Sequence, residues 1–369
     1  MAARSKVDRA PLSLFPTRQV WTLALNNQLT APPVYDTTRA FFSIEGDRVV
    51  CYELLSGAQQ WLVTARPQFE PVVGDGLLFV VERSALSALR VEDGAVAWQL
   101  PFEERLAVRP VWDNGWLILA TSGGSVLALR ATDGRLIWRQ ELGSPARGPA
   151  ALAADRVYVP IENGRVIAMN VTDGAPVWER RLGGAPNEIL ALEDRLYVGA
   201  QDNYFYCLMA KDGRIDWRWR TGGDVIGVPV VDDAYVYFVS LDNVLRALNR
   251  KSGGQKWLRA LPFRPAWAPV KVGETIAVAG QSTSMRAYAI ADGQSAGEVS
   301  APAEIAAAAH PVDNPSTTLP TLLIVTRHIK DGAAAVLVTR TIEPEGSNIV
   351  ALPNAPTLPT IQPTIQPSF

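Results

Sequence analysis

The sequence predicts an all-β fold in which one structural unit is repeated along the chain. Seven tryptophans recur at steps of 40, 37, 40, 40, 39 and 40 residues, and a fixed period of this length is typical of repeat architectures. A glycine stands four residues before six of them, and two short β-rich runs precede that glycine. The seven tryptophans, which we expect to pack between neighbouring units, are Trp21, Trp61, Trp98, Trp138, Trp178, Trp217 and Trp257.

The best-defined part of the unit is an eleven-residue phrase that starts with Ala or Cys and ends with Trp. Asp-Gly or Ser-Gly lies at its centre, between two apolar runs. This pattern strongly indicates a β-hairpin, because glycine adopts a positive φ angle at little cost. The phrase therefore predicts the last two strands of each unit. Its six copies span 51–61, 88–98, 128–138, 168–178, 207–217 and 247–257.

Two further strands precede each phrase. One is a β-rich run at 77–81, 117–120, 157–160, 196–198, 235–239 and 276–279. Ahead of most runs stands a proline, which suits the first residue of a strand because it lacks an amide hydrogen. Four short strands in about 40 residues, repeated seven or eight times, form a β-propeller. The prolines are Pro33, Pro71, Pro110, Pro149, Pro229 and Pro269.

The two ends of the repeat predict eight blades of four antiparallel strands. Trp21 is in register with the series but has no hairpin phrase before it. Residues 287–297 repeat the phrase with Gly297 in the tryptophan position, and 321–325 and 334–341 are expected to be strands. We therefore predict that an N-terminal strand around 20–25 completes the last blade, which closes the ring and removes two exposed edges.

An alternative assigns residues 348–352 as the final outer strand and leaves Trp21 without a place. In the closed ring, the predicted organisation is a flexible lead over 1–18, one propeller domain over 19–345 and a proline-rich tail over 346–369. Prolines favour extended, unpaired backbone, so the tail is interpreted as a tether. The Ala- and Pro-rich stretch 300–320 is expected to be a degenerate blade.

Composition and charge exclude several classes of function. Apolar residues make up 48% of the chain, the net charge is −2 and the pI is near 5.9, which gives no electrostatic case for nucleic acid or an anionic membrane. No stretch approaches the roughly 20 apolar residues of a transmembrane helix. The apolar run after the basic N-terminus is too short for a signal-peptide core. The chain is thus expected either to remain in the cytoplasm or to have a signal that this sequence lacks.

The phrase Ala-x-x-x-x-Asp-Gly-x-x-x-Trp resembles the tryptophan-docking repeat of the pyrroloquinoline-quinone (PQQ) β-propeller superfamily. The resemblance covers roughly residues 19–342. The family often has Asp two residues after the Ala, but Arg, Asn, Met or Glu stands there in these copies, which is typical of divergent, non-enzymatic members. Among members of this length, the chain is most similar to an eight-bladed lipoprotein of outer-membrane β-barrel assembly. This resemblance implies a protein-binding scaffold in the periplasm or at the outer membrane.

Few residues suggest chemistry, and we predict no catalytic, cofactor-binding or metal-binding residue. Cys51 and Cys207 occupy the small-residue position of the phrase in opposite blades, too far apart for a disulfide. They are interpreted as packing residues. His310 and His328 lack a third nearby His or Cys, so they make a weak metal site. Three carboxylates could line one face with a ligand, although solvated loop charges are the simpler interpretation; they are Glu162, Glu188 and Asp202.

Aromatic residues outside the repeat positions are the candidates for partner binding, because aromatic side chains and Arg are enriched at interface hot spots. Trp112 and Trp116 flank an Asp-Asn-Gly turn, and Phe263, Arg264 and Trp267 lie close together before a first strand. Core packing is the competing interpretation for Trp112 and Trp116. Trp267 is equally compatible with packing and with a position facing the channel mouth.

The predicted function is that of a non-enzymatic scaffold, a monomeric ring within a larger complex, which binds other proteins on one face. The expected partners are envelope or outer-membrane assembly components, and no cofactor is expected. The alternative from another class is a propeller that binds PQQ or another small ligand in its central channel, as an enzyme or a sensor.

Overall fold

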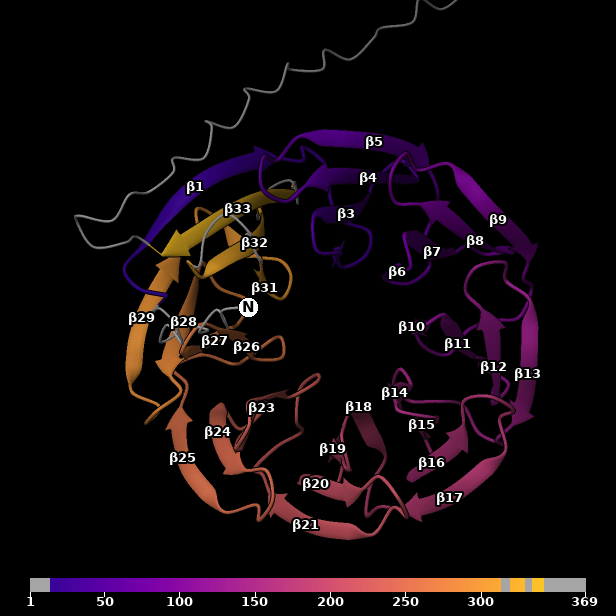
Figure 1. Ribbon diagram of the computed structural model, residues 1–369. Helices are drawn as coiled ribbons and strands as arrows, with labels where there is room; N and C mark the ends of the chain where they lie inside the picture. Colours follow the sequence, from indigo (N-terminus) through magenta and orange to yellow (C-terminus); the bar gives the residue numbers. More distant parts are fainter. Residues whose placement is uncertain (1–13, 313–318, 329–333, 342–369) are drawn as a thin grey trace, which may run out of the picture.

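The structure is a computed structural model that describes residues 14–312, 319–328 and 334–341. Every regular element in these ranges is a β-strand. The strands form eight antiparallel sheets, and the sheets are arranged as blades around a common axis (Figure 1). The predicted eight-bladed β-propeller is therefore confirmed.

Blades 1 to 7 each contain four consecutive strands, called first, second, third and outer from the axis outwards. Blade 1 comprises β2 (Val34–Tyr35), β3 (Arg39–Ile44), β4 (Arg48–Glu53) and β5 (Gln59–Thr64); blade 2 comprises β6 (Val72–Gly74), β7 (Leu77–Val81), β8 (Ala85–Arg90) and β9 (Val96–Pro101). Blade 3 comprises β10 (Val111–Asp113), β11 (Trp116–Ala120), β12 (Ser125–Arg130) and β13 (Leu136–Glu141); blade 4 comprises β14 (Ala151–Ala153), β15 (Arg156–Pro160), β16 (Arg165–Asn170) and β17 (Pro176–Arg181). Blade 5 comprises β18 (Pro186–Leu192), β19 (Arg195–Ala200), β20 (Tyr204–Met209) and β21 (Ile215–Arg220); blade 6 comprises β22 (Val230–Val231), β23 (Tyr235–Ser240), β24 (Val244–Asn249) and β25 (Gln255–Ala260); blade 7 comprises β26 (Val270–Val272), β27 (Thr275–Ala279), β28 (Ser284–Ala289) and β29 (Ser295–Ser300).

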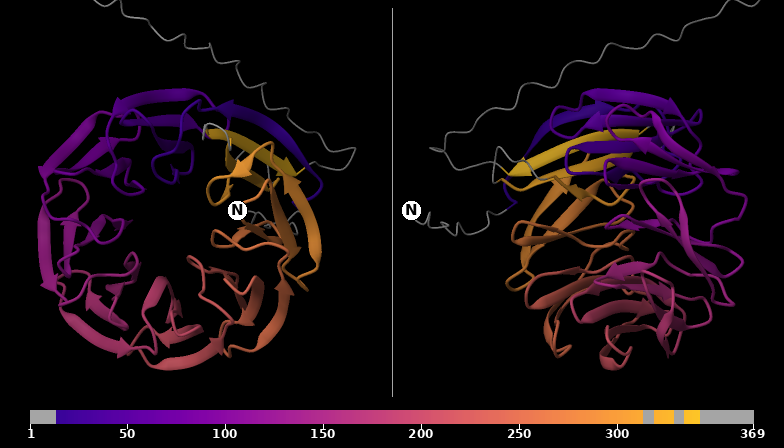
Figure 2. Two further views of the ribbon diagram at one scale, coloured as in Figure 1. Left: turned by 180° about the vertical axis from the view of Figure 1, so that it is seen from behind. Right: turned by 45° about the vertical axis from the view of Figure 1, so that its right-hand side comes forward.

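Blade 8 is built from both ends of the described chain. Its strands are β30 (Glu304–Ile305), β31 (His310–Pro311), β32 (Thr321–Arg327), β33 (Ala334–Thr341) and β1 (Thr17–Ala24). The N-terminal strand β1 pairs with β33 in antiparallel register, and Figure 2 shows the two strands side by side from two directions. This confirms the predicted closure. The alternative outer strand at 348–352 lies outside the described residues.

The innermost part of blade 8 consists of two short strands. β30 and β31 have two residues each, and both pair with β32. They are the only strands among the described residues of the stretch 300–320, for which a degenerate blade was predicted. β30 takes the place of the isolated bridge that five other blades have, such as Val225↔Ser240 in blade 6, and β31 takes the place of their first strand.

The ring has two faces, which differ in the connections they carry. One face carries the long loops that connect the blades, and each first strand begins there. We call it the loop face. Isolated bridges such as Leu106↔Thr121 and Val225↔Ser240 join these loops to the turns between second and third strands. The opposite face, the turn face, carries the tight turns between first and second strands and the Asp-Gly or Ser-Gly turns.

Each repeating tryptophan joins its blade to the next one. The indole Nε1 donates a hydrogen bond to a backbone carbonyl oxygen at the glycine-containing turn of the following blade, over 2.6 to 3.0 Å. Such bonds satisfy the polar end of a largely buried ring. Each of the seven indoles thus bridges two neighbouring blades. In chain order, the acceptors belong to Leu55, Val91, Ala131, Val171, Ala210, Arg250 and Ile290.

The turn glycine is required for two reasons. Gly174 has a φ angle of +72°, a conformation that is costly for residues with a Cβ atom. A Cβ atom placed there would also lie 2.7 Å from the Trp138 ring of the previous blade. The same approach recurs between Gly213 and Trp178 and at most other joints. The eleven-residue phrase therefore encodes both halves of the joint, the indole and the surface that receives it.

The joint between blades 7 and 8 has no tryptophan, because Gly297 takes its place. Phe15 fills the space: a Cβ atom on Gly297 would lie 2.5 Å from the Phe15 ring. The neighbouring Leu14 is fully buried. Leu14 and Phe15, which fall within the lead predicted over residues 1–18, therefore cover apolar surface that the missing indole would otherwise leave open.

Both cysteines are buried and free. Cys51 lies opposite Trp61 in blade 1, and Cys207 lies opposite Trp217 in blade 5. Burial raises the pKa of each thiol to about 12, so neither is a thiolate at neutral pH. Their interpretation as small packing residues in opposite blades is confirmed.

Candidate binding site at the channel mouth

A cavity lies on the loop face, around the mouth of the central channel. Its volume is about 760 Å³. It is lined by the loops that lead into the first strands of blades 1 to 4 and 6 and by the start of β18 in blade 5. Because the repeat places the same loop at the same height in each blade, residues far apart in sequence meet here. The polar and charged lining side chains are Thr30, Gln68, Glu70, Arg109, Arg147, Glu162, Asn187, Glu188 and Asp224.

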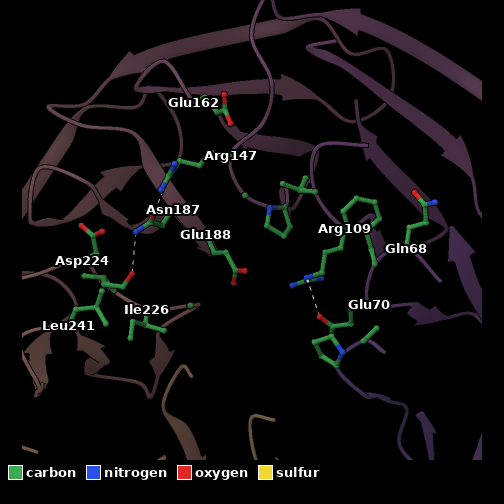
Figure 3. A pocket seen from close by; sticks show the side chains of 18 of the residues that line it. Gln68, Glu70, Arg109, Arg147, Glu162, Asn187, Glu188, Asp224, Ile226 and Leu241 are labelled. Carbon is green, nitrogen blue, oxygen red and sulfur yellow. Dashed lines mark hydrogen bonds and ion pairs between the residues drawn. The ribbon is translucent and has the colours of Figure 1, made fainter. Parts of the chain in front are cut away.

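One ion pair lies on the wall of this cavity. The Arg109 Nε and Glu70 Oε2 atoms are 3.6 Å apart, and both side chains are about one third exposed. Burial raises the pKa of Glu70, Arg109 lowers it and Glu188 raises it further, with a net rise. The Glu188 side chain extends into the space between Asn187 and this pair (Figure 3). The wall therefore concentrates negative charge that one arginine only partly offsets.

A second polar connection ties three blades together. The Arg147 Nε donates to the Asn187 Oδ1 over 3.3 Å, and the Asn187 Nδ2 donates to the Val225 carbonyl oxygen over 3.2 Å (Figure 3). Gly148 sits against the backbone of Asn187, which a Cβ atom would approach to 3.4 Å. These bonds fix the loops of blades 4, 5 and 6 relative to one another, so the cavity has a preformed wall on this side.

Two of the three carboxylates that could line one face belong to this cavity. Glu162 and Glu188 both line it. Asp202 does not: it accepts hydrogen bonds from the Tyr206 hydroxyl and the Tyr204 amide, and thereby orders its own turn in blade 5. Glu162 follows the second strand of blade 4, whereas Glu188 lies in the first strand of blade 5.

The histidines lie near the seam between blades 8 and 1. The His310 ring stacks on Tyr35 with centroids 4.0 Å apart, and His328 is exposed. The Tyr35 hydroxyl is buried without a hydrogen-bond partner, and burial raises its pKa. Within the described ranges, no three His, Cys, Asp or Glu side chains are arranged to hold a metal ion.

The cavity does not fit PQQ. This cofactor is a flat tricarboxylate, whereas the lining has four carboxylates, Glu70, Glu162, Glu188 and Asp224, against the two guanidinium groups of Arg109 and Arg147. An anionic ligand would be repelled by the excess negative charge. Phe69 supplies the one aromatic ring among the lining residues, so a flat ligand also lacks a pair of rings between which to stack.

The structure separates the aromatic residues predicted to bind partners. Trp112 and Trp116 lie near the turn face, at the hairpin between β10 and β11. Both are half-buried and pack between blades. Trp112 covers Gly74, where a Cβ atom would lie 2.0 Å from the indole, and its Nε1 is buried without a partner. The packing of this pair leaves little aromatic surface exposed.

The other predicted group lies on the loop face, before β26. Arg264 is exposed, whereas Phe263 and Trp267 are half-buried against the cores of blades 6 to 8. Trp267 is not among the residues that line the cavity. A partner that binds one face of the ring can therefore contact only one of the two predicted groups.

Sequence reasoning missed most of the cavity wall. Glu70, Arg109, Arg147, Asn187 and Asp224 were not singled out. The sequence pattern could have identified two of these residues, because Glu70 and Arg109 stand directly before the prolines that precede first strands. A charged residue at that position must lie on the loop face near the axis, where its neighbours from other blades converge.

Comparison with known proteins connects this architecture to a family. The model of the family described as outer membrane protein assembly factor BamB matches residues 15–108, 82–192 and 188–320. BamB of Yersinia pestis is 28% identical over 194 residues, which cover 49% of this chain and 40% of that protein. The chain thus aligns with well under half of the length of this curated relative.

Solved structures share the fold. The crystal structure of BamB from Moraxella catarrhalis superimposes with a TM-score of 0.70 and 19% identity, covering 88% of this chain and 99% of that one. A quinohemoprotein alcohol dehydrogenase from Pseudomonas putida HK5 superimposes with a TM-score of 0.66 and 13% identity, covering 90% and 79%. At these identities both likenesses concern the fold alone.

Proposed function

The chain belongs to the family of the outer membrane protein assembly factor BamB, and from this premise we propose that it is a non-enzymatic scaffold for protein–protein interaction in outer-membrane protein assembly. The family match carries this proposal. It is supported by the use of the repeat tryptophans and of both cysteines in packing, which leaves loops and outer surfaces for binding. In the described residues no helix is long and apolar enough to span a membrane.

The loop face is the proposed binding face. It carries the preformed cavity wall of Arg147, Asn187 and Glu188, as well as the exposed Arg264. Fixed polar groups around an open cavity favour recognition because little side-chain freedom is lost on binding. We further propose that the protein acts at the periplasmic side of the outer membrane as a monomeric ring within a larger complex.

The test is co-purification of the full chain with the assembly components of its own organism. We expect the wild type to recover a partner. Recovery should be lost in the double variant Arg264→Glu, Phe263→Ala and retained in the control Arg135→Glu, which reverses an exposed charge on the turn face. Recovery of no partner by the wild type would overturn the scaffold proposal. Equal loss in both variants would overturn the choice of face.

The small-ligand alternative has its own measurement. PQQ with Ca²⁺ is added to the protein, and the unfolding temperature and dehydrogenase activity are recorded. Because the cavity lining carries an excess of carboxylates, no shift and no turnover are expected. A saturable shift accompanied by turnover would replace the scaffold with a quinoprotein enzyme.

A further inference from the structure

The outer rim of the ring has a strongly uneven charge. The aligned ten-residue segments that hold the glycine turn and outer strand span 172–181, 211–220 and 251–260 in blades 4, 5 and 6, and we call them the basic arc. They contain nine Lys and Arg against four Asp and Glu, a net charge of +5. The corresponding segments of blades 1 to 3, residues 55–64, 92–101 and 132–141, contain two against four, a net charge of −2.

The cations of the basic arc are held mostly by neutral groups. Arg180 donates to the Gly213 carbonyl oxygen over 2.7 Å, and Arg259 donates to the Gly293 carbonyl oxygen over 2.8 Å. The Arg218 guanidinium lies 4.7 Å from the Tyr204 ring centroid, and the Lys256 ammonium lies 3.9 Å from that of Tyr235. Carbonyl and ring contacts orient a cation without cancelling its charge.

Two of the four acidic side chains of the arc are already engaged by arginines from strands further inside. Glu179 pairs with Arg165 over 3.0 Å, and Asp216 pairs with Arg195 over 3.0 Å. In blade 3, by contrast, Arg139 of the outer strand pairs with Glu104 and Glu141. Arg90 and Arg130, at the ends of the third strands of blades 2 and 3, pair with the turn carboxylates Asp93 and Asp133. The positive charge of the basic arc is therefore available to an external anion.

We propose that the basic arc is a docking surface for an acidic segment of a partner protein. This inference rests on the proposed scaffold function and adds the chemistry of one partner. Charge complementarity defines the occupant. The shape favours a polypeptide over a bilayer, because β17, β21 and β25 lie on a convex arc (Figure 1) that a flat membrane touches at one blade at a time. An acidic chain segment can follow this curve.

Two exposed arginines show how such a segment would be contacted. Arg218 and Arg220 are exposed and alternate with the half-buried Trp219 along β21, so their side chains stand on the same side of the strand. Arg181 is exposed at the corresponding end of β17. Aliphatic surface accompanies the charges at Val177 and Leu258, which are 39% and 42% exposed. The surface thus combines separated cations with apolar contacts.

Binding of a labelled peptide of alternating Glu and Thr to the full chain, followed by fluorescence anisotropy, tests the proposal. Two triple variants are compared. The arc variant carries Arg181→Glu, Arg218→Glu and Arg220→Glu. The control variant makes the same change of charge at three exposed arginines of blades 2 and 3, Arg83→Glu, Arg105→Glu and Arg135→Glu. We expect an affinity loss of about tenfold or more in the arc variant and little change in the control. Raising the salt concentration should weaken wild-type binding, since surface charges are screened.

Several outcomes would overturn the proposal. These are no binding by the wild type, an equal loss in both variants, or equal binding of the matching Gln-Thr peptide. Binding to phosphatidylglycerol vesicles that requires the arc, without peptide binding, would replace the acidic segment with a lipid surface. If the charge-reversal variant fails to fold, the milder triple replacement by Gln gives the same comparison.

Co-purification separates this proposal from the scaffold function. If the arc variant retains every partner that the wild type recovers, the scaffold stands and the basic arc is not a partner surface. If neither protein recovers a partner, the scaffold function itself fails.

Discussion

Seven joints between blades share one construction, whereas the joint between blades 7 and 8 is built differently. In the seven, an indole reaches into the glycine turn of the following blade and donates to its backbone. In the eighth, Gly297 stands in the tryptophan position and Phe15, from outside the repeat, covers it. The phenyl ring fills space but has no donor. The difference shows that the repeat needs a bulky apolar side chain at each joint, while the hydrogen bond is a feature of the tryptophan joints.

The largest expected effect is the loss of stability when a tryptophan joint is truncated, compared with the loss at the joint between blades 7 and 8. Trp138 is 7% exposed and donates to the Val171 carbonyl oxygen over 2.6 Å, so Trp138→Ala should lower the free energy of unfolding by about 4 kcal/mol. Phe15 is only half-buried, and Phe15→Ala should lower it by about 1–2 kcal/mol. Denaturant unfolding followed by circular dichroism measures both. Equal losses would mean that the two kinds of joint are energetically equivalent.

The receiving side of the joint gives a matched pair of glycines. Gly174 and Gly76 both have a φ angle of +72°, but only Gly174 lies against a tryptophan; nothing lies within 4 Å of a Cβ atom on Gly76. Gly76→Ala should cost about 1 kcal/mol, the backbone strain alone. Gly174→Ala should cost about 3 kcal/mol, because a displaced indole is added to the strain. If unfolding experiments give the same loss for both, the close approach to Trp138 does not contribute.

On the loop face, the Asp242 carboxylate of blade 6 accepts a hydrogen bond from the Gly222 amide after the outer strand of blade 5, and so reinforces the joint between these blades. Burial of Asp242 raises its pKa, but hydrogen bonds from Arg246, Ser240 and the Gly222 amide outweigh this and lower the pKa to about 2. Because the folded-state pKa is depressed, the carboxylate stabilises the fold above the unfolded-state pKa, and this stability is lost as the pH falls from about 4 to about 2.

Asp242→Asn should therefore cost about 2 kcal/mol at neutral pH and progressively less below about pH 4. Unfolding free energies of the wild type and the variant, measured across this range, check the prediction. Asp212, an exposed turn residue, provides the control: Asp212→Asn should have a much smaller effect. A difference that does not depend on pH would assign the loss at Asp242 to packing.

The smallest expected effect is the coupling between the two positions of the eighth joint. Gly297→Trp alone should destabilise the protein by about 3 kcal/mol or more, because Gly297 has a φ angle of +155°, which residues with a Cβ atom avoid, and the new side chain competes with Phe15 for one space. Combined with Phe15→Ala, the loss should shrink, which a double-mutant cycle detects as coupling between the two positions. Additive effects would show that the two rings occupy separate spaces.

The sequence predicted the ring because its repeat contains both partners of each joint. The register of Trp21 and the gap at Gly297 were enough to fix eight blades and their closure. Phe15 was not foreseen, since a side chain that substitutes for a repeat position from outside the repeat has no periodic signal. Leu14 escaped notice for the same reason.

The candidate site was predictable only in part. Glu162 and Glu188 were considered with Asp202 as carboxylates that could line one face, and the first two line the cavity, one from the turn after a second strand and one from a first strand. The pair Glu70 and Arg109 and the contact of Arg147 with Asn187 depend on how far each loop leans toward the axis, and loop length and side-chain direction decide this. The basic arc was visible in the residues, but its significance depends on which cations pair with carboxylates, and this requires coordinates.

The closure by β1 has a consequence for folding during synthesis. Thr17 pairs with Thr341, so 324 positions of the chain separate the partners. On the ribosome, β1 emerges before any other described strand. It remains unpaired until β33, the last described strand, has been synthesised. Pairing over such a separation is slow and leaves strand edges open to aggregation in the meantime. A chain that stops before β33 keeps this edge exposed, so ring closure distinguishes finished molecules from truncated ones.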